Sequence, residues 1–444
     1  MTRADPAPRS HRGIRLLGSL LVISALVGSA RPAGAAEFEG DRVEISVSGE
    51  GYLELNDRRY RGPFVVTAES DGLAVVERVG VEAYLEGIRE VPFSWERHAL
   101  AAQAVAARTY LAWTLSEGRT GAGRRIGYDI CATAACQVYA GVDAVLGPEG
   151  DRWRAAVAAT AGEILVFEGS PARAFYSSTT GGRTRNIEDI WPGSAPAPYL
   201  VGVPSPGEES PFVEWSWELP AFLMHRLLEE ADVASGEVQS VTSRTTEDGE
   251  GPWMVDIVSD LGTVSLDTWE LRARINRAAS IMPLRLPASN DEGRVYPTTI
   301  LSPQYTIRSE MHIGRFHNEV YPNPHYVVEG GGWGHLIGMS QFGAQAMAES
   351  GATYPEILAH YYGGLTPVPG ESFLPDELLV GLTVGADSVS VSSDALLRAD
   401  IDGVVHDAPA PGVWEFDLED GRIRVKVPRA NPPLVPPGPP LTPF

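Results

Sequence analysis

The first part of the chain alternates between apolar and polar residues in four short runs, at 43–47, 52–55, 64–67 and 73–76. Alternation with a period of two over four to eight residues is typical of half-buried β-strands. Gly residues and an Asn-Asp pair separate the runs. The pattern therefore predicts a β-rich start of the folded chain, over residues 36–80.

An alanine-rich segment at 95–116 follows, and its composition favours an α-helix. Ser94 can cap its start, Glu96 suits the positive end of the helix dipole, and Gly118 can end it. The apolar side chains that share one stripe of this helix are Leu100, Ala104, Ala107 and Leu111. Because alanine is small, we expect neighbouring segments to approach this helix closely and the helix to lie at the centre of the fold.

Helical and strand patterns alternate along the rest of the chain. Residues 204–209 are rich in Pro and Glu and predict a surface loop, and the composition after Gly370 predicts short strands joined by acidic turns. The other expected elements are helices at 151–161, 220–231, 267–277 and 340–350, and strands at 164–167, near Val238 and Val255, and over 306–328.

These elements predict an α+β fold, with two mixed lobes around a groove and a small C-terminal β segment. The expected divisions are a signal peptide at 1–35, a main domain at 36–369, a small β appendage at 370–428 and a Pro-rich tail at 429–444. Within the main domain, the expected parts are the β-rich start at 36–80, a helix-centred core at 81–203, a mixed insert lobe at 204–300 and the completion of the core at 301–369.

The N-terminal 35 residues have the pattern of an export signal. Arginines at positions 9, 12 and 15 precede an apolar run at 16–27, and Ala-Gly-Ala at 33–35 offers a cleavage site. We expect cleavage after Ala35 and a location in the periplasm, the cell wall or the extracellular space. An uncleaved anchor is the alternative, but a run of about 12 residues is shorter than the roughly 20 that a membrane-spanning helix needs.

The chain of 444 residues is acidic, with a formal net charge of -23. Cleavage would remove five arginines and one aspartate, which changes the charge from -23 to -27. An acidic surface repels phosphate backbones and anionic lipids, so we expect no nucleic-acid partner and no membrane contact beyond the signal segment. We also expect no cofactor: the glycine run at 330–335 lacks the third glycine of a dinucleotide-binding loop, because Ile337 stands there.

Cys131 and Cys136 are the two cysteines of the chain. In an exported protein they most simply form a disulfide that closes a small loop. A zinc site is the alternative, but zinc needs four ligands and the four intervening residues include no His, Asp or Glu. We therefore expect the disulfide and no metal.

Three polar segments are candidates for chemistry. The first holds Glu90 ahead of Val91 and a proline, and the proline keeps Val91 extended, so Glu90 lies on a fixed approach to the long helix. The second, at 175–184, has hydroxyl side chains followed by paired glycines, and the third covers 332–343. Each segment also has an interpretation without chemistry. Glu90 can be a solvated carboxylate, residues 175–184 can be a strand that ends in a hydrogen-bonded turn, and His335 can be a core histidine.

Together these segments resemble the stage II sporulation protein D and amidase-enhancer family, over about residues 58–366. The motifs that carry the resemblance keep their order along the chain and lie at 81–92 with 99–110, 128–131 with 136–139, 176–182, 334–343 and 357–363.

The resemblance implies an exported lytic transglycosylase that cleaves MurNAc–GlcNAc linkages of peptidoglycan glycan strands and leaves 1,6-anhydromuramic ends. Glu90 matches the family's single catalytic acid, and its pKa should be raised by burial against apolar neighbours, of which Trp95 and the helix alanines are candidates. Gln103 and Arg108 are expected to support the site from behind. The candidates for sugar binding are Tyr176, Ser177, Ser178, His335, Ser340 and Gln341.

Other members of the family are enhancers of cell-wall amidases. The alternative function is therefore a non-catalytic, wall-binding enhancer whose partner is an N-acetylmuramoyl-L-alanine amidase. In that case the acidic surface and the C-terminal β segment would bind the partner.

The chain departs from the family pattern at three positions. Ala135 replaces a histidine that often precedes the second cysteine, which removes one potential metal ligand and favours the disulfide. Leu336 replaces a glycine of the Gly-His-Gly-Val-Gly motif, and we expect the larger residue to narrow that turn. Val91 replaces a commoner methionine, which we interpret as a packing substitution.

Overall fold

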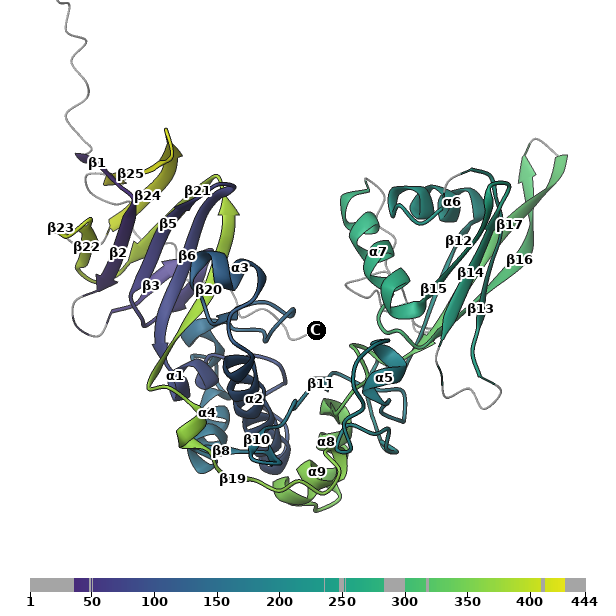
Figure 1. Cartoon of the computed structure of the whole chain (residues 1–444), viewed down its shortest axis with the longest axis horizontal. Helices are drawn as coiled ribbons and strands as arrows, with labels where there is room; N and C mark the ends of the chain where they lie inside the picture. The colour runs from purple at the N-terminus through teal and green to yellow at the C-terminus, as the bar shows by residue number, and fades with distance from the viewer. Residues whose placement is uncertain are drawn as a thin grey trace, which may run out of the picture.

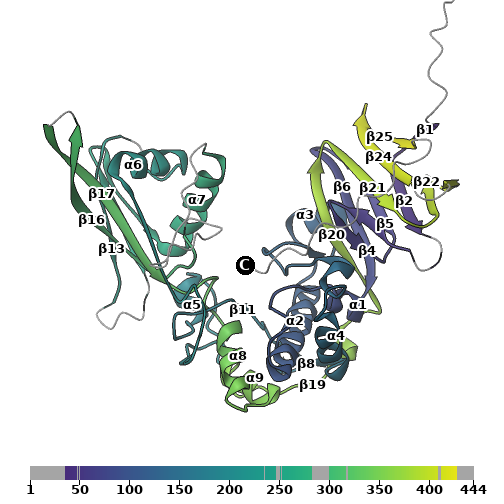
Figure 2. The ribbon, with the colours of Figure 1, turned by 180° about the vertical axis from the view of Figure 1, so that it is seen from behind.

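The computed structural model describes residues 36–427, apart from 48, 50, 235, 247–250, 252, 283–299, 317–318 and 409–411. The expected signal peptide at 1–35 and the Pro-rich tail at 429–444 lie outside the described residues. The expected α+β class is confirmed, because helices and several sheets alternate along the described chain. Figures 1 and 2 show two lobes that form the arms of a V, with α8 (Gln341–Glu349) and α9 (Tyr354–Tyr361) at its base. A groove between the lobes stays a prediction.

The first lobe is built on two sheets that share one core. The larger sheet consists, in spatial order, of β23 (Val404–Ala408), β22 (Leu397–Ile401), β2 (Arg42–Val47), β5 (Phe64–Glu69), β6 (Gly72–Gly80), β20 (Glu377–Ala386) and β7 (Ile130–Cys131). The smaller sheet consists of β1 (Ala36–Gly40), β25 (Arg422–Val427), β24 (Gly412–Glu419), β21 (Ser388–Ser393), β3 (Leu53–Leu55) and β4 (Arg58–Tyr60). The four strands expected near the start of the chain are present as β2, β3, β5 and β6.

The strands after Gly370 belong to these same two sheets. β20 pairs with β6, β22 with β2, and β25 with β1. Apolar side chains from both ends of the chain, such as Val43 and Phe416, lie in one cluster. The segment at 370–428, expected as a separate appendage, is therefore part of the first lobe, because alternation predicts which face of a strand is buried but not which strand it pairs with.

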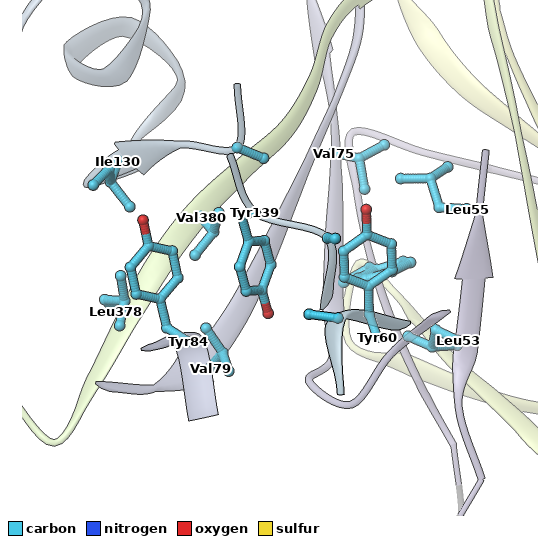
Figure 3. Close-up of a cluster of buried hydrophobic side chains, with 14 of the residues drawn as sticks. Leu53, Leu55, Tyr60, Val75, Val79, Tyr84, Ile130, Tyr139, Leu378 and Val380 are labelled. Atoms are coloured by element: carbon cyan, nitrogen blue, oxygen red, sulfur yellow. The ribbon is translucent and has the colours of Figure 1, made fainter. Parts of the chain in front are cut away.

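The core of the first lobe buries one carboxylate. Figure 3 shows the rings of Tyr84, Tyr139 and Tyr60 side by side among aliphatic side chains. Glu77 on β6 is fully buried beside them; it accepts hydrogen bonds from the N–H of Gly62 (3.0 Å) and the hydroxyl of Tyr139 (2.8 Å). Burial raises the pKa of Glu77 to about 7, because a charged carboxylate loses its hydration there.

The long helix α2 (Arg97–Glu117) lies at the centre of the fold, as expected. One face, with Leu100, Ala104 and Leu111, packs into the first-lobe core. The other face, with Ala102 and Val105, packs into a second cluster beneath α8 and α9. Small alanine side chains on both faces let the helix pack closely on either side. The helices α1 (Val81–Glu86) and α4 (Gly150–Ala159) pack beside it.

The start of α2 differs from the prediction. Its N-cap is Glu96 rather than Ser94, and no side chain caps the first turn. The side-chain oxygen of Gln345 instead accepts the N–H of Glu96 (2.9 Å). Arg152 also donates to the carbonyls of residues 93–95, so contacts distant in sequence fix this approach. The expected end at Gly118 is confirmed, with a φ of 75°.

The second lobe contains two three-stranded sheets and two helices around its own core. The sheets are β12 (Glu214–Pro220), β17 (Glu319–Gly331) and β16 (Tyr305–Phe316), and β13 (Val238–Arg244), β14 (Met254–Ser259) and β15 (Gly262–Asp267). The helices are α6 (Ala221–Glu230) and α7 (Thr268–Ile281). The long hairpin β16–β17 thus belongs to this lobe, whereas we expected residues after 300 to complete the core.

The segment between the lobes is made of short elements. It contains helix α5 (Ile187–Ile190), and the two-stranded ladders are β8 (Glu163–Ile164) with β19 (Val368–Pro369), β9 (Val166–Phe167) with β10 (Ser170–Pro171), and β11 (Tyr176–Ser177) with β18 (Met339–Ser340). Helix α3 (Gly121–Ile126) lies in the first lobe, where Arg125 pairs with Glu69 and Asp71. The strand expected at 164–167 is thus two short strands. In Figures 1 and 2, α2, β11 and α5 follow one another from the first lobe toward the second.

Candidate active site around Glu90

Glu90 follows α1 on a loop whose backbone is tied to residues 137–140. The N–H of Arg89 donates to the carbonyl of Val138 (2.9 Å), and Ile88 forms a β-bridge with Tyr139. The N–H of Val138 in turn donates to Oε1 of Glu90 (2.6 Å). The half-buried Glu90 side chain is therefore held in one place by backbone groups.

A chain of hydrogen bonds surrounds the Glu90 carboxylate. The hydroxyl of Tyr176 donates to Glu90. Nε2 of Gln137 donates to the oxygen of that hydroxyl (2.9 Å) and to the carbonyl of Ala107 on α2 (3.1 Å). Oε1 of Gln137 accepts the hydroxyl proton of Tyr84 (2.9 Å). Because every member of this network has a partner, Glu90, Tyr176 and Gln137 fix one another's orientation.

Burial raises the pKa of Glu90, although hydrogen bonds from Val138 and Tyr176 act in the opposite direction. Burial, reinforced by the charge of Glu90, also raises the pKa of Tyr84 and of Tyr176 well above the ordinary value. Both phenols therefore keep their protons, and Glu90 is the member of the network that ionises first. A carboxyl group that retains its proton to higher pH has the property that a general acid needs.

The expected burial of Glu90 against Trp95 and the helix alanines stays a prediction. Trp95 packs edge to face against Phe342, with ring centroids 5.0 Å apart. The hydrogen bonds to Glu90 come from Tyr176 and the backbone of Val138.

The second and third polar segments come together beside Glu90. β11 and β18 run parallel, with Tyr176 opposite Met339 and Ser177 opposite Ser340. The carbonyl of Tyr176 accepts a hydrogen bond from His335. Tyr176 therefore contacts the first segment through its hydroxyl and the third segment through its backbone.

His335 is a neutral histidine in aromatic surroundings. Its Nδ1 accepts the N–H of Ile337 (3.1 Å), which leaves the other ring nitrogen to donate to Tyr176. Burial, assisted by the charge of Arg272, lowers the pKa of His335 to about 4. The rings of Phe175 and Trp191 lie 5.8 and 5.4 Å from the imidazole, centroid to centroid. Both ring nitrogens thus have hydrogen-bond partners within the protein, so these contacts fit a core histidine better than a residue that binds sugar.

Three of the residues expected to bind sugar are buried. The exposed fractions of Ser177, Ser340 and Gln341 are 6%, 0% and 5%. Ser340 is the N-cap of α8, and its hydroxyl accepts the N–H of Gly343 (3.1 Å). Tyr176, Ser178 and His335 are half-buried, so these three keep surface that a ligand can reach.

Gln103 and Arg108 both lie in the interior, as a supporting role requires. Arg108 is fully buried; it donates to both carboxylate oxygens of Glu82 (2.9 and 2.7 Å) and to the carbonyls of Val157 and Glu163. It thereby ties α2 to α1 and to α4. Gln103 accepts a bond from Gln341 (3.3 Å) and joins α2 to α8.

Glu208 is a second anchored carboxylate, which no sequence motif singles out. Its oxygens accept the hydroxyls of Thr179 (2.6 Å), Thr180 (2.6 Å) and Ser340 (2.5 Å). Burial alone would raise the pKa of Glu208, but hydrogen bonds from these hydroxyls and from Ser205 outweigh it and lower the pKa. Its position in a Pro- and Glu-rich loop gives no sequence signal, because the donors lie in segments distant along the chain.

The expected disulfide between Cys131 and Cys136 is present. Cys136 directly precedes Gln137 and Val138, which both bond to the Glu90 network. The disulfide therefore restrains the loop that holds the candidate acid. Gln137 and Val138 lie in the motif at 136–139, but the sequence did not predict that either residue contacts the Glu90 network.

An aromatic strip leads away from the Glu90 network. We define it as the half-buried rings of Tyr110, Trp113, Phe175, Trp191 and Trp269. Their successive ring centroids lie 5.7, 5.3, 5.0 and 5.6 Å apart. The strip begins on α2, continues past α5 and ends on α7, which Figure 1 shows in the arm formed by the second lobe.

The glycine-rich turn at 330–335 lies close to the segment that holds Ser177, as its glycine content suggests. Gly334 has a φ of 118°, and a Cβ there would lie 2.4 Å from Cβ of Ser177. Leu336 has a φ of 67°, which is uncommon for a residue with a side chain. Its side chain is fully buried. Leu336 therefore keeps the left-handed backbone that glycine favours, and its side chain packs inward rather than against a ligand.

Comparison with known proteins agrees with the resemblance. Residues 69–167 match the family model SpoIID, described as stage II sporulation protein. Stage II sporulation protein D of Bacillus subtilis (strain 168) is 26% identical over 372 residues, which cover 81% of this chain and 94% of that protein. The amidase enhancer of the same strain is 28% identical over 316 residues, 64% of this chain and 40% of that protein. An uncharacterized protein of Brachyspira hyodysenteriae is 27% identical over 349 residues, 75% of this chain and 82% of that protein.

Among the residues that the structure describes, no helix combines the length and the apolar character needed to cross a membrane. The motif order, the convergence of the three segments and the matches above agree with one another. The chain is therefore similar to stage II sporulation protein D and to the amidase enhancer, and its residues 69–167 match the SpoIID family model.

Proposed function

We propose that this protein is an exported lytic transglycosylase that cleaves MurNAc–GlcNAc linkages in peptidoglycan, with Glu90 as its catalytic acid. The observation that carries the proposal is the environment of Glu90: a half-buried carboxyl group with a raised pKa, fixed by Val138 and Tyr176. Tyr176 joins it to the two other segments of the family pattern.

The reaction needs one group that first gives and then receives a proton. Protonated Glu90 donates its proton to the glycosidic oxygen while the bond from that oxygen to the anomeric carbon of MurNAc breaks. The 6-hydroxyl of the same sugar attacks the anomeric carbon, and its proton passes to the Glu90 carboxylate. Glu90 is then protonated again, no water is consumed, and the new end is 1,6-anhydromuramic acid.

The absence of a partner carboxylate supports this route over hydrolysis. Glycoside hydrolases commonly use two carboxyl groups that flank the bond. Among the described residues, the groups that perturb the pKa of Glu90 are a backbone N–H and a phenol, and no second carboxylate is among them. Glu208 is saturated by hydroxyl and N–H donors, so it has no free lone pair directed at a water molecule.

The aromatic strip supports a glycan substrate. Partly exposed aromatic faces suit the apolar faces of sugar rings. Tyr110 at one end lies close enough to Glu90 for the carboxylate charge to raise the pKa of the phenol, after the larger effect of burial. We propose that successive sugars lie along this strip, with Tyr176 and Ser178 as the polar contacts nearest the acid.

The test uses the full mature chain and glycan strands freed of peptides. The variant Glu90→Gln keeps the size of the side chain but cannot donate the proton, so cleavage should slow by about 10²- to 10⁴-fold. Glu96→Gln, an exposed glutamate six residues away, serves as the matched control and should cleave at the wild-type rate. Equal rates for wild type and Glu90→Gln would remove Glu90 from catalysis.

A second candidate function is a wall-binding enhancer of an amidase. The observation that favours it is the relative named amidase enhancer, although the match covers 40% of that protein. In this case, Glu90→Gln would bind cell wall and stimulate release of stem peptides by an added N-acetylmuramoyl-L-alanine amidase as well as the wild type does, and neither protein would shorten glycan strands.

A further inference from the structure

A group of metal-ligating side chains lies in the second lobe, whereas Glu90 lies in the first. Glu218 on β12, His312 on β16 and His325 on β17 each offer one ligand atom, and these atoms lie within 4.8 Å of one another. In the part of the chain that the structure describes, no other group of three His, Cys, Asp or Glu side chains is this compact.

The register of the three strands explains why these residues meet. Pro220, the last residue of β12, and Glu310 on β16 both lie opposite His325. His312 is two residues beyond Glu310 and so points to the same face of the sheet. The two imidazole rings stack with centroids 4.3 Å apart. From that position, Nε2 of His312 reaches across β17 to Oε1 of Glu218 (3.0 Å).

The backbone prepares His325 as a ligand. Its Nδ1 lies 2.9 Å from the carbonyl oxygen of Asn323. A carbonyl can only accept, so Nδ1 carries the proton and Nε2 keeps its lone pair. A backbone carbonyl that fixes the tautomer in this way is the usual second partner of a metal-binding histidine. The side chains of His312 and Glu218 are 41% and 44% exposed, so an ion can reach them from solvent.

The set of donor atoms fits zinc. Two imidazole nitrogens and one carboxylate oxygen are a common Zn²⁺ ligand set, with a fourth position left for water. Zinc–ligand distances of about 2.1 Å place tetrahedral ligand atoms about 3.4 Å apart, so rotation of these exposed side chains can close the 4.8 Å spread. Glu310, 3.4 Å from Nε2 of His312, adds a nearby negative charge, although Arg308 also pairs with it.

We propose that Glu218, His312 and His325 form a binding site for a divalent transition-metal ion, with Zn²⁺ as the best fit. The proton on Nε2 of His312 now lies between the carboxylates of Glu218 and Glu310, and a metal ion would replace it. The ion would tie β12 to the part of the β16–β17 hairpin that begins where β12 ends and extends past it. The proposal does not depend on the function of Glu90.

The experiment is a calorimetric titration of the full mature chain, freed of metal by chelation, with ZnCl₂. One Zn²⁺ should bind per chain. His325→Ala and Glu218→Gln should each weaken binding at least tenfold, because each removes one ligand. His406→Ala, which removes a half-buried histidine of the first lobe, should bind as the wild type does. Circular dichroism of each variant checks that it folds.

Cobalt provides a second measurement that does not require any variant. Co²⁺ in a site with imidazole and carboxylate ligands should give visible absorption that excess Zn²⁺ removes. Two results would overturn the proposal. One is no binding of Zn²⁺ to the wild type, and the other is binding that folded His325→Ala and folded Glu218→Gln both retain at wild-type strength.

Discussion

The buried carboxylate of Glu77 should make the first lobe less stable as the pH rises. Its pKa is about 7 in the folded chain against an ordinary value of 4.5. Between these values the folded state holds the proton more tightly than the unfolded state does. The stabilisation from the protonated form is therefore complete below pH 4.5 and is lost as the pH rises through about 7.

The size of the effect follows from the difference between the two pKa values. Each pKa unit corresponds to about 1.4 kcal/mol, so full ionisation of Glu77 should cost about 3 kcal/mol of unfolding free energy. Glu77→Gln removes the charge and keeps the shape. Its side-chain oxygen can still accept the N–H of Gly62, and its amide can donate to the hydroxyl of Tyr139, both of which now bond to Glu77.

The assay is urea unfolding of wild type and Glu77→Gln at several pH values between 5 and 8. Trp414 is fully buried in the first-lobe core and contributes to the tryptophan fluorescence that follows unfolding, beside tryptophans of the second lobe such as Trp215 and Trp217. Part of the loss already occurs below pH 5, so the variant should gain about 2.5 kcal/mol relative to wild type between pH 5 and pH 8. All other titrating groups cancel in this difference. A difference that stays constant over this range would refute the reasoning.

Three further variants test the surroundings of the candidate acid. Tyr176→Phe removes a donor to the carboxylate, so the pKa of Glu90 should rise further and the alkaline limb of the pH–activity profile should move to higher pH; a fixed limb would contradict the hydrogen bond. Arg108→Met removes the buried guanidinium that donates to Glu82 and to the carbonyls of Val157 and Glu163. It should lower the unfolding free energy by about 3 kcal/mol in urea titrations, whereas a loss below about 1 kcal/mol would contradict its supporting role. Replacing Cys131 and Cys136 by Ser should cost about 2 kcal/mol, measured in the same way, because the loop they close is short; unchanged stability would show that the loop is held by other contacts.

Local patterns in the sequence predicted most elements because their causes are local. Alanine content predicted α2, and Gly118 predicted its end. Alternation predicted β2 and β5. The pairing of β20 with β6 and of β25 with β1 could not be predicted in this way, because it joins residues about 300 or more positions apart. The contact between Gln345 and Glu96 that fixes the start of α2 could not be predicted either, because the two residues are also distant in sequence.

The candidate site was predictable in part. The motif that holds Glu90 and the segment that holds Tyr176 were both singled out, and the structure joins them. A serine that binds a ligand and a serine that caps a helix look alike in the sequence. Ser340 was therefore predicted to bind sugar, and in the structure it caps α8. Glu208 gave no signal because its donors come from distant segments.

The claim that a single carboxyl group drives attack by the sugar's own hydroxyl is tested most directly in water labelled with ¹⁸O. Glycan strands are digested by the wild-type protein in this solvent and the new ends are weighed by mass spectrometry. The account predicts anhydromuramic ends that carry no label, and their loss with Glu90→Gln. New reducing ends that contain ¹⁸O would show that water is the nucleophile and would contradict the account.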